Sequence, residues 1–328
     1  MTQRLRDHGD DLDALVAQTA AARSLPAAYV EKDFWVTEVL RAATVDRSVT
    51  MPDGSAAAVS FLFKGGTSLS RVFGIVDRFS EDVDLLAVFP QGAATNARHK
   101  VLKQVDTDVT THLRLTKADV EIGASTTGVK RYTTYHYPTA RVGDGLKEGV
   151  LLELGSRGGT YPAGPHAYLS MVADYATSHL GEAEDTWEEF AAFEVNVLAP
   201  ERTLLEKIAA VHDAAVRNET ATLLKHGRHF YDIDRLLNTP SVTDALDALG
   251  PDGSAELIED INTHSADADF SWSPRPEGGY ADSPAFDPKA DAHPAIRTGF
   301  EAAQALIHGA RITLDNVLAT VRTNRARL

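Results

Sequence analysis

The sequence predicts an α+β fold in which a mixed sheet flanked by helices is followed by a helical C-terminal region. Residues 1–199 alternate between short apolar runs, typical of strands, and amphipathic runs, typical of helices. From residue 200 onward the apolar spacing is helical. We therefore expect an α+β domain over residues 1–199 and a helical domain over residues 200–328.

The first half contains the predicted strands. Ala56–Phe63 is a short apolar run that enters a Gly-Gly turn, as a buried strand does. Ser24 is a suitable N-cap, and Pro26 a suitable first-turn residue, for the second of two N-terminal helices. The other expected strands are residues 83–89, 118–124, 129–137, 149–155 and 193–198. The expected helices are residues 1–22, 24–45, 67–75 and 93–115.

The second half is predicted to be helical. Pro200 begins a helix that runs to about Arg217, and further helices are expected at residues 220–238 and 294–325, with one or two more at residues 241–263. Residues 265–293 are rich in proline and glycine. A loop of this length is uncommon unless it has a function or is disordered, so we expect a long loop or lid here.

Composition indicates an ordinary globular chain, with 43% hydrophobic and 24% charged residues. No apolar run reaches the length of about 18 residues that a membrane helix needs, so no membrane association is expected. The absence of cysteine excludes disulfides and cysteine-ligated zinc. Together with an N-terminus unlike a secretory signal, it favours a cytoplasmic location.

A net charge of −15 argues against a protein that coats nucleic acid with its whole surface. Basic residues do cluster at residues 225–235 and 322–327. Each cluster is either a local nucleic-acid patch or a solvated helix face, and the sequence leaves both interpretations open. The 12 histidines lack the spacing of a HExxH zinc motif, so no zinc site is expected.

Asp82 and Asp84 are the leading candidates for a catalytic site. Residues two apart in a strand share a face, so the two carboxylates point the same way, and Val83, Leu85 and Ala87 point the other way. Neighbouring carboxylates repel each other unless a cation lies between them. Hard oxygen ligands of this kind suit Mg²⁺ or Mn²⁺, with substrate phosphates completing the coordination shell.

A glycine-rich turn precedes the carboxylate pair. Gly65 and Gly66 allow the backbone to approach a phosphate closely, and the helix that follows offers unpaired N–H groups at its start. Fourteen residues separate Thr67 from Asp82, which is enough for one short helix and a return to the sheet. The candidate nucleotide-binding residues are Lys64, Gly65, Gly66, Thr67, Ser68 and Arg71.

This order of turn, helix and Asp-x-Asp resembles the polymerase-β-type nucleotidyltransferase superfamily. The segments KGGTSLSR at residues 64–71 and RFSEDVDL at residues 78–85 resemble more specifically the AbiEii toxin family. This family comprises the nucleotidyltransferase toxins of AbiE- and MenT-type toxin–antitoxin pairs. Further similar segments are Val30–Val36, Pro200–Lys207 and Arg228–Asp232, so that the resemblance covers residues 28–237. It implies a nucleotidyltransferase-like fold whose helical C-terminal domain completes the active site.

The resemblance implies a third carboxylate and a catalytic lysine. Superfamily members carry the third carboxylate on a neighbouring strand, and Glu153 within an apolar run is the candidate, with a pair to Arg157 as the alternative. The family places its lysine on the helix that begins at Pro200, which gives Lys207. Arg202 can pair with Glu206 at helical spacing. The metal ligands would then be Asp82, Asp84 and Glu153.

A further acidic residue completes the candidate set. Asp232 matches an active-site aspartate of the family and can orient Lys207 or Arg228. Lys225, Arg228, His229 and Asp232 are expected on one helix, where an exposed ion-pair network is the alternative interpretation.

Three hypotheses for function follow. The first is an enzyme that uses Mg²⁺ to transfer a nucleotide from an NTP to an acceptor. The resemblance implies the 3′ end of tRNA as acceptor, blocked aminoacylation as the result, and a separately encoded antitoxin. The second is a kinase-like phosphotransferase that uses the same metal site. The third is a catalytically silent binding protein of a defence complex, against which the intact Asp82 and Asp84 argue.

Ser80 is a candidate regulatory site. It lies two residues before Asp82, so in an extended segment it shares the face of the carboxylates. Some antitoxins of the resembling family are kinases that phosphorylate a serine in this kind of position. The alternative is a serine that only caps the turn into the strand.

Overall fold

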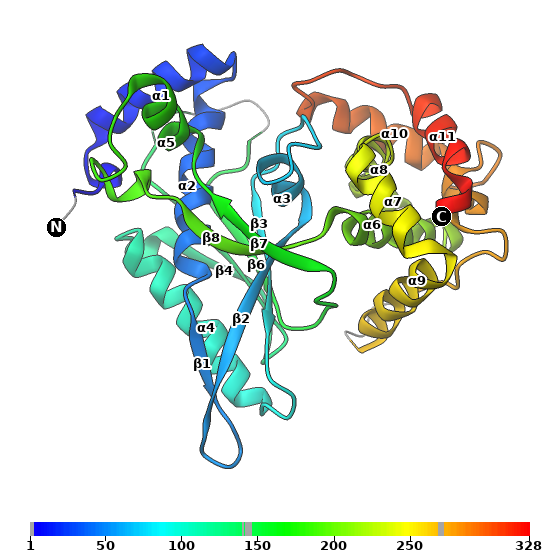
Figure 1. The fold of residues 1–328 in the computed structure, drawn as a ribbon, viewed down its shortest axis with the longest axis horizontal. Coiled ribbons are helices and arrows are strands. Elements are labelled where there is room, and N and C mark those ends of the chain that lie inside the picture. Colours follow the sequence, from blue (N-terminus) through cyan, green and yellow to red (C-terminus); the bar gives the residue numbers. More distant parts are fainter. Residues whose placement is uncertain (1–2, 140, 142–145, 268–271) are drawn as a thin grey trace. The chain divides into compact units, whose positions relative to one another are not determined.

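The structure is a computed structural model that describes residues 3–139, 141, 146–267 and 272–328. The described residues form two compact units (Figure 1). Unit 1 lies within Met1–Thr67, Ser80–Ser156 and Ala163–Val197; unit 2 lies within Ser68–Phe79, Arg157–Pro162 and Leu198–Leu328. Two short segments of the N-terminal half therefore belong to the mainly helical unit, which the division expected between residues 199 and 200 did not include.

Unit 1 is built around a mixed sheet, which has eight strands in the described part of the chain. The strand order is β4-β5-β6-β3-β2-β8-β7, and β1 pairs with β2. Strand β3 pairs antiparallel with β2 and parallel with β6, so it lies inside the sheet. The strands are Arg47–Thr50 (β1), Ala56–Lys64 (β2), Asp82–Val88 (β3), Val120–Thr126 (β4), Lys130–Tyr135 (β5), Val150–Gly155 (β6), Ala163–Tyr168 (β7) and Phe193–Leu198 (β8).

The helices of unit 1 cover this sheet, and α2 is the most deeply buried. They are Gly9–Arg23 (α1), Ala27–Ala43 (α2), Thr95–His112 (α4) and Met171–Tyr175 (α5). Helix α2 contacts β3 and β6 and packs against α4. It is buried along most of its length, including the charged residues Glu31, Lys32, Asp33 and Glu38. Buried charges need partners, and Glu38 has Arg6, Arg41 and His112.

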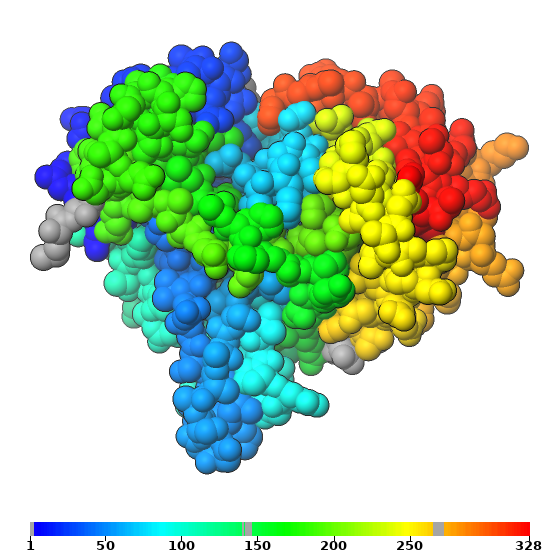
Figure 2. Space-filling model, viewed as in Figure 1, coloured from blue at the N-terminus to red at the C-terminus, as the bar shows by residue number. Residues whose placement is uncertain are grey.

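Two local expectations for unit 1 change. Ser24 does not cap α2; it ends α1 in the left-handed conformation at φ 55°, and Pro26 is the residue that precedes α2. Strands β1 and β7 were not expected, because RSVT is short and polar and AGPHAY contains glycine and proline. Strands β1 and β2 form a hairpin whose tip, residues 52–55, is exposed and projects from the surface of unit 1 (Figure 2).

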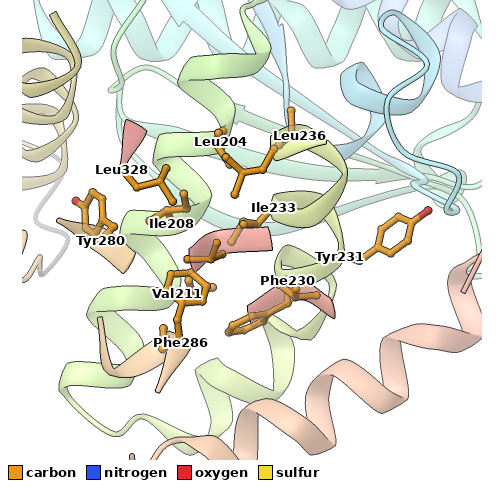
Figure 3. Packing of buried hydrophobic residues seen from close by; sticks show 14 of the residues in the cluster. Leu204, Ile208, Val211, Phe230, Tyr231, Ile233, Leu236, Tyr280, Phe286 and Leu328 are labelled. Atoms are coloured by element: carbon orange, nitrogen blue, oxygen red, sulfur yellow. The ribbon is translucent and has the colours of Figure 1, made fainter. Parts of the chain in front are cut away.

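Unit 2 is helical. Its helices are Pro200–Val216 (α6), Thr220–Lys225 (α7), Gly227–Leu237 (α8), Pro240–Asp267 (α9), His293–Ala303 (α10) and Leu314–Thr323 (α11), and most of Gly65–Arg71 (α3) joins them. Leu204 and Val211 of α6 pack with Phe230 and Ile233 of α8 (Figure 3). No helix in the described ranges combines the length and the apolar character that crossing a membrane requires.

The described part of the expected lid belongs to the core of unit 2. Tyr280 and Phe286, from the segment before α10, are buried in the same apolar cluster as α6 and α8 (Figure 3). His212 of α6 lies with its Nδ1 2.8 Å from Ser283 Oγ and its Nε2 3.0 Å from the Pro274 carbonyl oxygen. Residues 272–292 are therefore fixed to unit 2 by packing and hydrogen bonds; residues 268–271 of the expected loop lie outside the described residues.

Two helices expected to be continuous are interrupted. The expected helix 220–238 breaks at His226 into α7 and α8, and the expected helix 294–325 divides into α10 and α11. Glycine disfavours a helix interior, and Gly227 follows the first break. It also permits close packing: a Cβ at Gly227 would lie 2.0 Å from the carbonyl oxygen of Gly299 in α10.

We expect Gly227→Ala to destabilise unit 2, because the added methyl group would meet backbone rather than a flexible side chain. Overpacking of this kind costs about 1–3 kcal/mol, so thermal unfolding should begin several degrees lower. Gly9→Ala is the control, since a Cβ there meets nothing within 4 Å. Equal melting temperatures for the two variants would contradict this account of the helix contact.

Candidate active site

Asp82 and Asp84 lie at the start of β3 and share one face of the strand, as the strand period predicts. Asp82 is 7% exposed and Asp84 is half-buried. Val83 and Leu85 on the opposite face are buried. Leu86 continues the face of the carboxylates and is also buried. The polar residues on this face of β3 are therefore confined to the first three residues of the strand.

The register of neighbouring strands places further polar residues beside Asp84. Asp84 pairs with Lys64 of β2 on one side and with Glu153 of β6 on the other. Glu153 in turn pairs with Tyr132 of β5. Register partners point to the same face of a sheet, so a cation, two carboxylates and a phenol form a row across four strands. The candidate third carboxylate thus lies next to the Asp-x-Asp pair.

Tyr132 was not among the expected site residues. Its burial, together with the negative charges of Glu153 and Asp84, raises the pKa of Tyr132 to about 12. The phenol therefore keeps its proton at neutral pH and is a donor beside Glu153. Only the strand register reveals this position, because Tyr132 is distant in sequence from both carboxylates.

The glycine turn meets the carboxylates directly. Gly65 has φ 81°, and a Cβ at this position would lie 2.0 Å from Asp84 Oδ2. A side chain here would displace the carboxylate, so the turn needs glycine for its conformation and for space. Thr67 Oγ1 donates to the Asp82 carbonyl oxygen at 2.6 Å and lies 3.0 Å from Ser80 Oγ. These contacts join the turn to the start of β3.

Three charged residues surround Asp82. Lys147 Nζ lies 3.2 Å from Asp82 Oδ2, and the Lys147 N–H donates to Glu81 Oε2 at 2.9 Å. Lys32 Nζ of α2 lies 3.2 Å from Glu81 Oε2 and donates to the Lys147 carbonyl oxygen at 2.8 Å. Burial lowers the pKa of Lys32, and the charge of Glu81 opposes this effect. Sequence patterns missed this network, although Lys32 belongs to a segment that carries the family resemblance.

Unit 2 holds a second group of charges around Asp232, which is fully buried in α8. Arg78 donates to both of its carboxylate oxygens at 2.6 Å, and Lys207 Nζ lies 3.0 Å from Oδ2. Burial alone would raise the pKa of Asp232, but Arg78 and Lys207 together lower it below the usual value. Burial lowers the pKa of Lys207, and Asp232 opposes this. Asp232 is therefore paired with both Arg78 and Lys207, and a role for it in orienting Lys207 stays a prediction.

The remaining candidates of unit 2 are arranged differently from the expectation. Because the chain breaks at His226, Lys225 ends α7 and does not share a helix with Arg228, His229 and Asp232. The rings of His226 and His229 are stacked with centroids 4.5 Å apart. Burial lowers the pKa of His226 to about 4, so it is neutral at pH 7. Arg202 pairs with Glu206 at 3.1 Å, as its spacing predicts.

Other expected residues lie in unit 2. Ser68 is buried and Arg71 half-buried in α3, and both belong to unit 2, as does Arg157. Two basic residues near the C-terminus form ion pairs at the surface, Arg325 with Asp282 and Arg327 with Asp247. In the described part of the chain, no three His, Cys, Asp or Glu side chains converge closely enough to form a ready-made metal cage.

The mixed sheet flanked by helices, followed by a helical region, is the architecture of a nucleotidyltransferase-like fold. The chain matches the family described as nucleotidyl transferase AbiEii toxin, type IV toxin–antitoxin system, over residues 54–319. This match covers most of the chain, which therefore belongs to the AbiEii toxin family. Type IV toxin–antitoxin membership implies an antitoxin as a partner. A search among curated proteins found no match.

We expect Asp232→Asn to destabilise unit 2, because Arg78 and Lys207 would keep buried positive charges without a counter-charge. Breaking a buried pair in this way costs about 3–5 kcal/mol. The matched control is Asp247→Asn, which removes the same bidentate contact to an arginine at an exposed site and should change stability little. Urea unfolding of the two variants at pH 7 measures the difference.

The pH dependence of the Asp232 variant supplies a second check. The pKa of Lys207 is lowered in the folded protein, so the unfolded chain binds more protons just below the ordinary lysine pKa of about 10.5. Stability of Asp232→Asn should therefore rise towards pH 10. If the free energy of unfolding of Asp232→Asn does not change between pH 7 and 10, the buried charge of Lys207 is not what destabilises the variant.

Proposed function

We propose that this protein is a Mg²⁺-dependent nucleotidyltransferase toxin that transfers an NMP from an NTP to the 3′ end of tRNA. The proposal rests above all on the row of side chains in which Asp84 lies between Lys64 and Glu153, two residues along β3 from Asp82. Family membership supports the transferase class. The tRNA acceptor rests on the family resemblance, and a blocked 3′ end would stop aminoacylation and translation.

The carboxylates on this face of the sheet suit a divalent cation, and because the described side chains form no ready-made cage, substrate phosphates would complete its coordination shell. Asp82, Asp84 and Glu153 supply hard oxygen donors, and the ammonium of Lys147 marks the position at Asp82 where positive charge is already accommodated. Mg²⁺ or Mn²⁺ bound to these carboxylates would supply charge neutralisation for the phosphates and activation of the acceptor hydroxyl.

The protein's own side chains would bind and orient the reactants. Gly65 leaves room for the carboxylate of Asp84 beside the turn, where backbone N–H groups can meet phosphate oxygens. The acceptor hydroxyl oxygen forms a bond to the α-phosphorus, the bond from that phosphorus to the β-phosphate oxygen breaks, and pyrophosphate leaves. The hydroxyl proton passes to a carboxylate of the row, where Tyr132 beside Glu153 retains its own proton.

The Arg78–Asp232–Lys207 group would act on the triphosphate. Lys207 has its ammonium oriented by Asp232, and a lysine in this state is a point charge suited to phosphate oxygens. The family resemblance matches Lys207 and Asp232 to an active-site lysine and aspartate, and on that ground we assign them to the same reaction as Asp82 and Asp84.

We expect Asp84→Asn to lower the rate of nucleotide transfer at least about a hundredfold. Mutation of residues that only support a metal ligand lowers activity about 10- to 100-fold, and mutation of the ligand itself should lower it more. The variant's melting temperature without metal should stay the same or rise slightly, since repulsion from Glu153 is relieved. The assay incubates protein and total tRNA with each NTP labelled at the α-phosphate. Asp53→Asn, at an exposed turn, is the control.

The position of the label separates the hypotheses. Label from the α-phosphate on tRNA supports nucleotide transfer, whereas label from the γ-phosphate would identify the kinase-like alternative. Near-normal transfer by Asp84→Asn would refute the carboxylate site, and transfer to no RNA with any NTP would refute the tRNA acceptor.

We also propose that phosphorylation of Ser80 silences the enzyme. Ser80 Oγ lies 3.0 Å from the Thr67 hydroxyl, which itself donates to the backbone of Asp82. A phosphate here would add about −1.5 to −2 charges beside carboxylates that must admit a triphosphate. It would also compete for the cation that these carboxylates need.

We expect Ser80→Asp to be inactive in the transfer assay, and Ser80→Ala to be active but resistant to an antitoxin that is a kinase. Ser60→Asp adds the same charge at an exposed position of β2 and should leave transfer unchanged. Full activity of a sample phosphorylated stoichiometrically at Ser80, verified by mass spectrometry, would exclude this mechanism.

A further inference from the structure

Lys32 is an unusual residue for the middle of a buried helix. Lysine is almost never fully buried unless it is paired, yet the Lys32 side chain is only 2% exposed. Its ammonium has three acceptors, namely Glu81 Oε2 at 3.2 Å, the Lys147 carbonyl oxygen at 2.8 Å and the Gly149 carbonyl oxygen. All three N–H donors are thus used, and the fold retains a costly buried charge where an apolar residue would pack.

The acceptors of Lys32 all flank Asp82. Glu81 is the residue before Asp82, and Lys147 and Gly149 lead into β6, which pairs with β3. Glu81 also accepts the N–H of Lys147 at 2.9 Å. Lys32 therefore fixes the backbone from which the Lys147 side chain starts, as well as the residue beside Asp82.

The backbone of Lys147 is held by hydrogen bonds to Glu81 and Lys32, whereas most of its side chain is exposed to solvent. Its ammonium lies 3.2 Å and 3.3 Å from the two oxygens of Asp82, but 60% of its side chain is exposed. A divalent cation and an ammonium cannot occupy the same side of one carboxylate without repulsion. A cation that binds Asp82 would displace the Lys147 ammonium, and the oxygens of an arriving triphosphate are the nearest new anions.

We propose that Lys147 is a mobile counter-ion of the site, paired with Asp82 in the nucleotide-free protein and with a phosphate of the NTP during the reaction, and that Lys32 is the positioning residue that anchors it. The inference rests on the proposed function for the divalent cation and the NTP. It adds a nucleotide-contacting residue and its anchor to that function.

The inference predicts two effects of Lys147→Met with opposite signs. Loss of the competing ammonium should tighten Mn²⁺ binding about fivefold, because a partly exposed ion pair contributes an affinity factor of about this size. Electron paramagnetic resonance of free Mn²⁺ measures this affinity. Loss of the phosphate contact should weaken binding of an α,β-methylene NTP analogue by a similar factor, measured by calorimetry with Mn²⁺ present. Lys103→Met, on the exposed side of α4, removes the same charge and should change neither value.

Lys32 is tested by a double-mutant cycle. If it acts by anchoring Lys147, Lys32→Met should shift both affinities in the same directions as Lys147→Met, and should add little in a Lys147→Met background. A merely structural lysine would cause the same change in both backgrounds. If circular dichroism shows that Lys32→Met is unfolded, Glu81→Gln replaces it in the cycle, because Glu81 contacts both Lys32 and the backbone of Lys147.

Asp82→Asn separates failure of this inference from failure of the proposed function. If Asp82→Asn binds Mn²⁺ as the wild type does, the carboxylates are not the metal site and both proposals fall. If Asp82→Asn loses Mn²⁺ while Lys147→Met matches the wild type in both affinities, the metal site stands and only the counter-ion role is overturned.

Discussion

The register of β2, β3 and β6 is the constraint on which the carboxylate site depends. Asp84 faces Lys64 on one neighbouring strand and Glu153 on the other, and Gly65 approaches Asp84 so closely that no side chain fits. A slip of one residue on any of these strands would turn its polar side chain to the opposite face. Such a slip of β3 would move Asp84 to the face where Val83 and Leu85 are buried, so the cost of burying an unpaired charge opposes it.

Charge balance is the second requirement, and α2 supplies part of it. Like charges on Asp84 and Glu153 disfavour the folded sheet unless cations lie nearby. Lys64 lies in register with Asp84, and Lys147 lies against Asp82 on a backbone anchored by Lys32. This explains why α2 carries Lys32 although the helix is buried against the sheet. The other buried charges of α2 have different partners, such as His112 for Glu38 and the Met171 N–H for Asp33.

The spacing of apolar and polar residues along the sequence was sufficient to predict part of the site and the fold class. Strand period placed Asp82 and Asp84 on one face, and the apolar runs around Ala56–Phe63 and Glu153 were typical of buried strands. The α+β class with a helical C-terminal region is confirmed. Contacts distant in sequence could not be read in this way: Tyr132 beside Glu153 and Lys32 beside Glu81 follow from strand pairing and helix packing. The break at His226 was missed because the packing of Gly227 against Gly299 overrides helical spacing.

The charges within unit 1 point to the kind of ligand that its site accepts. Asp82, Asp84 and Glu153 gather negative charge on one face of the sheet, which favours a cation. Lys64 lies in register with Asp84 and Lys147 lies against Asp82, so positive charge that favours an anion is present on the same unit. A nucleoside triphosphate with its divalent cation carries both kinds of charge in one complex, whereas a bare metal ion or a free phosphate carries only one. The charges of unit 1 therefore support the proposed NTP independently of the family match.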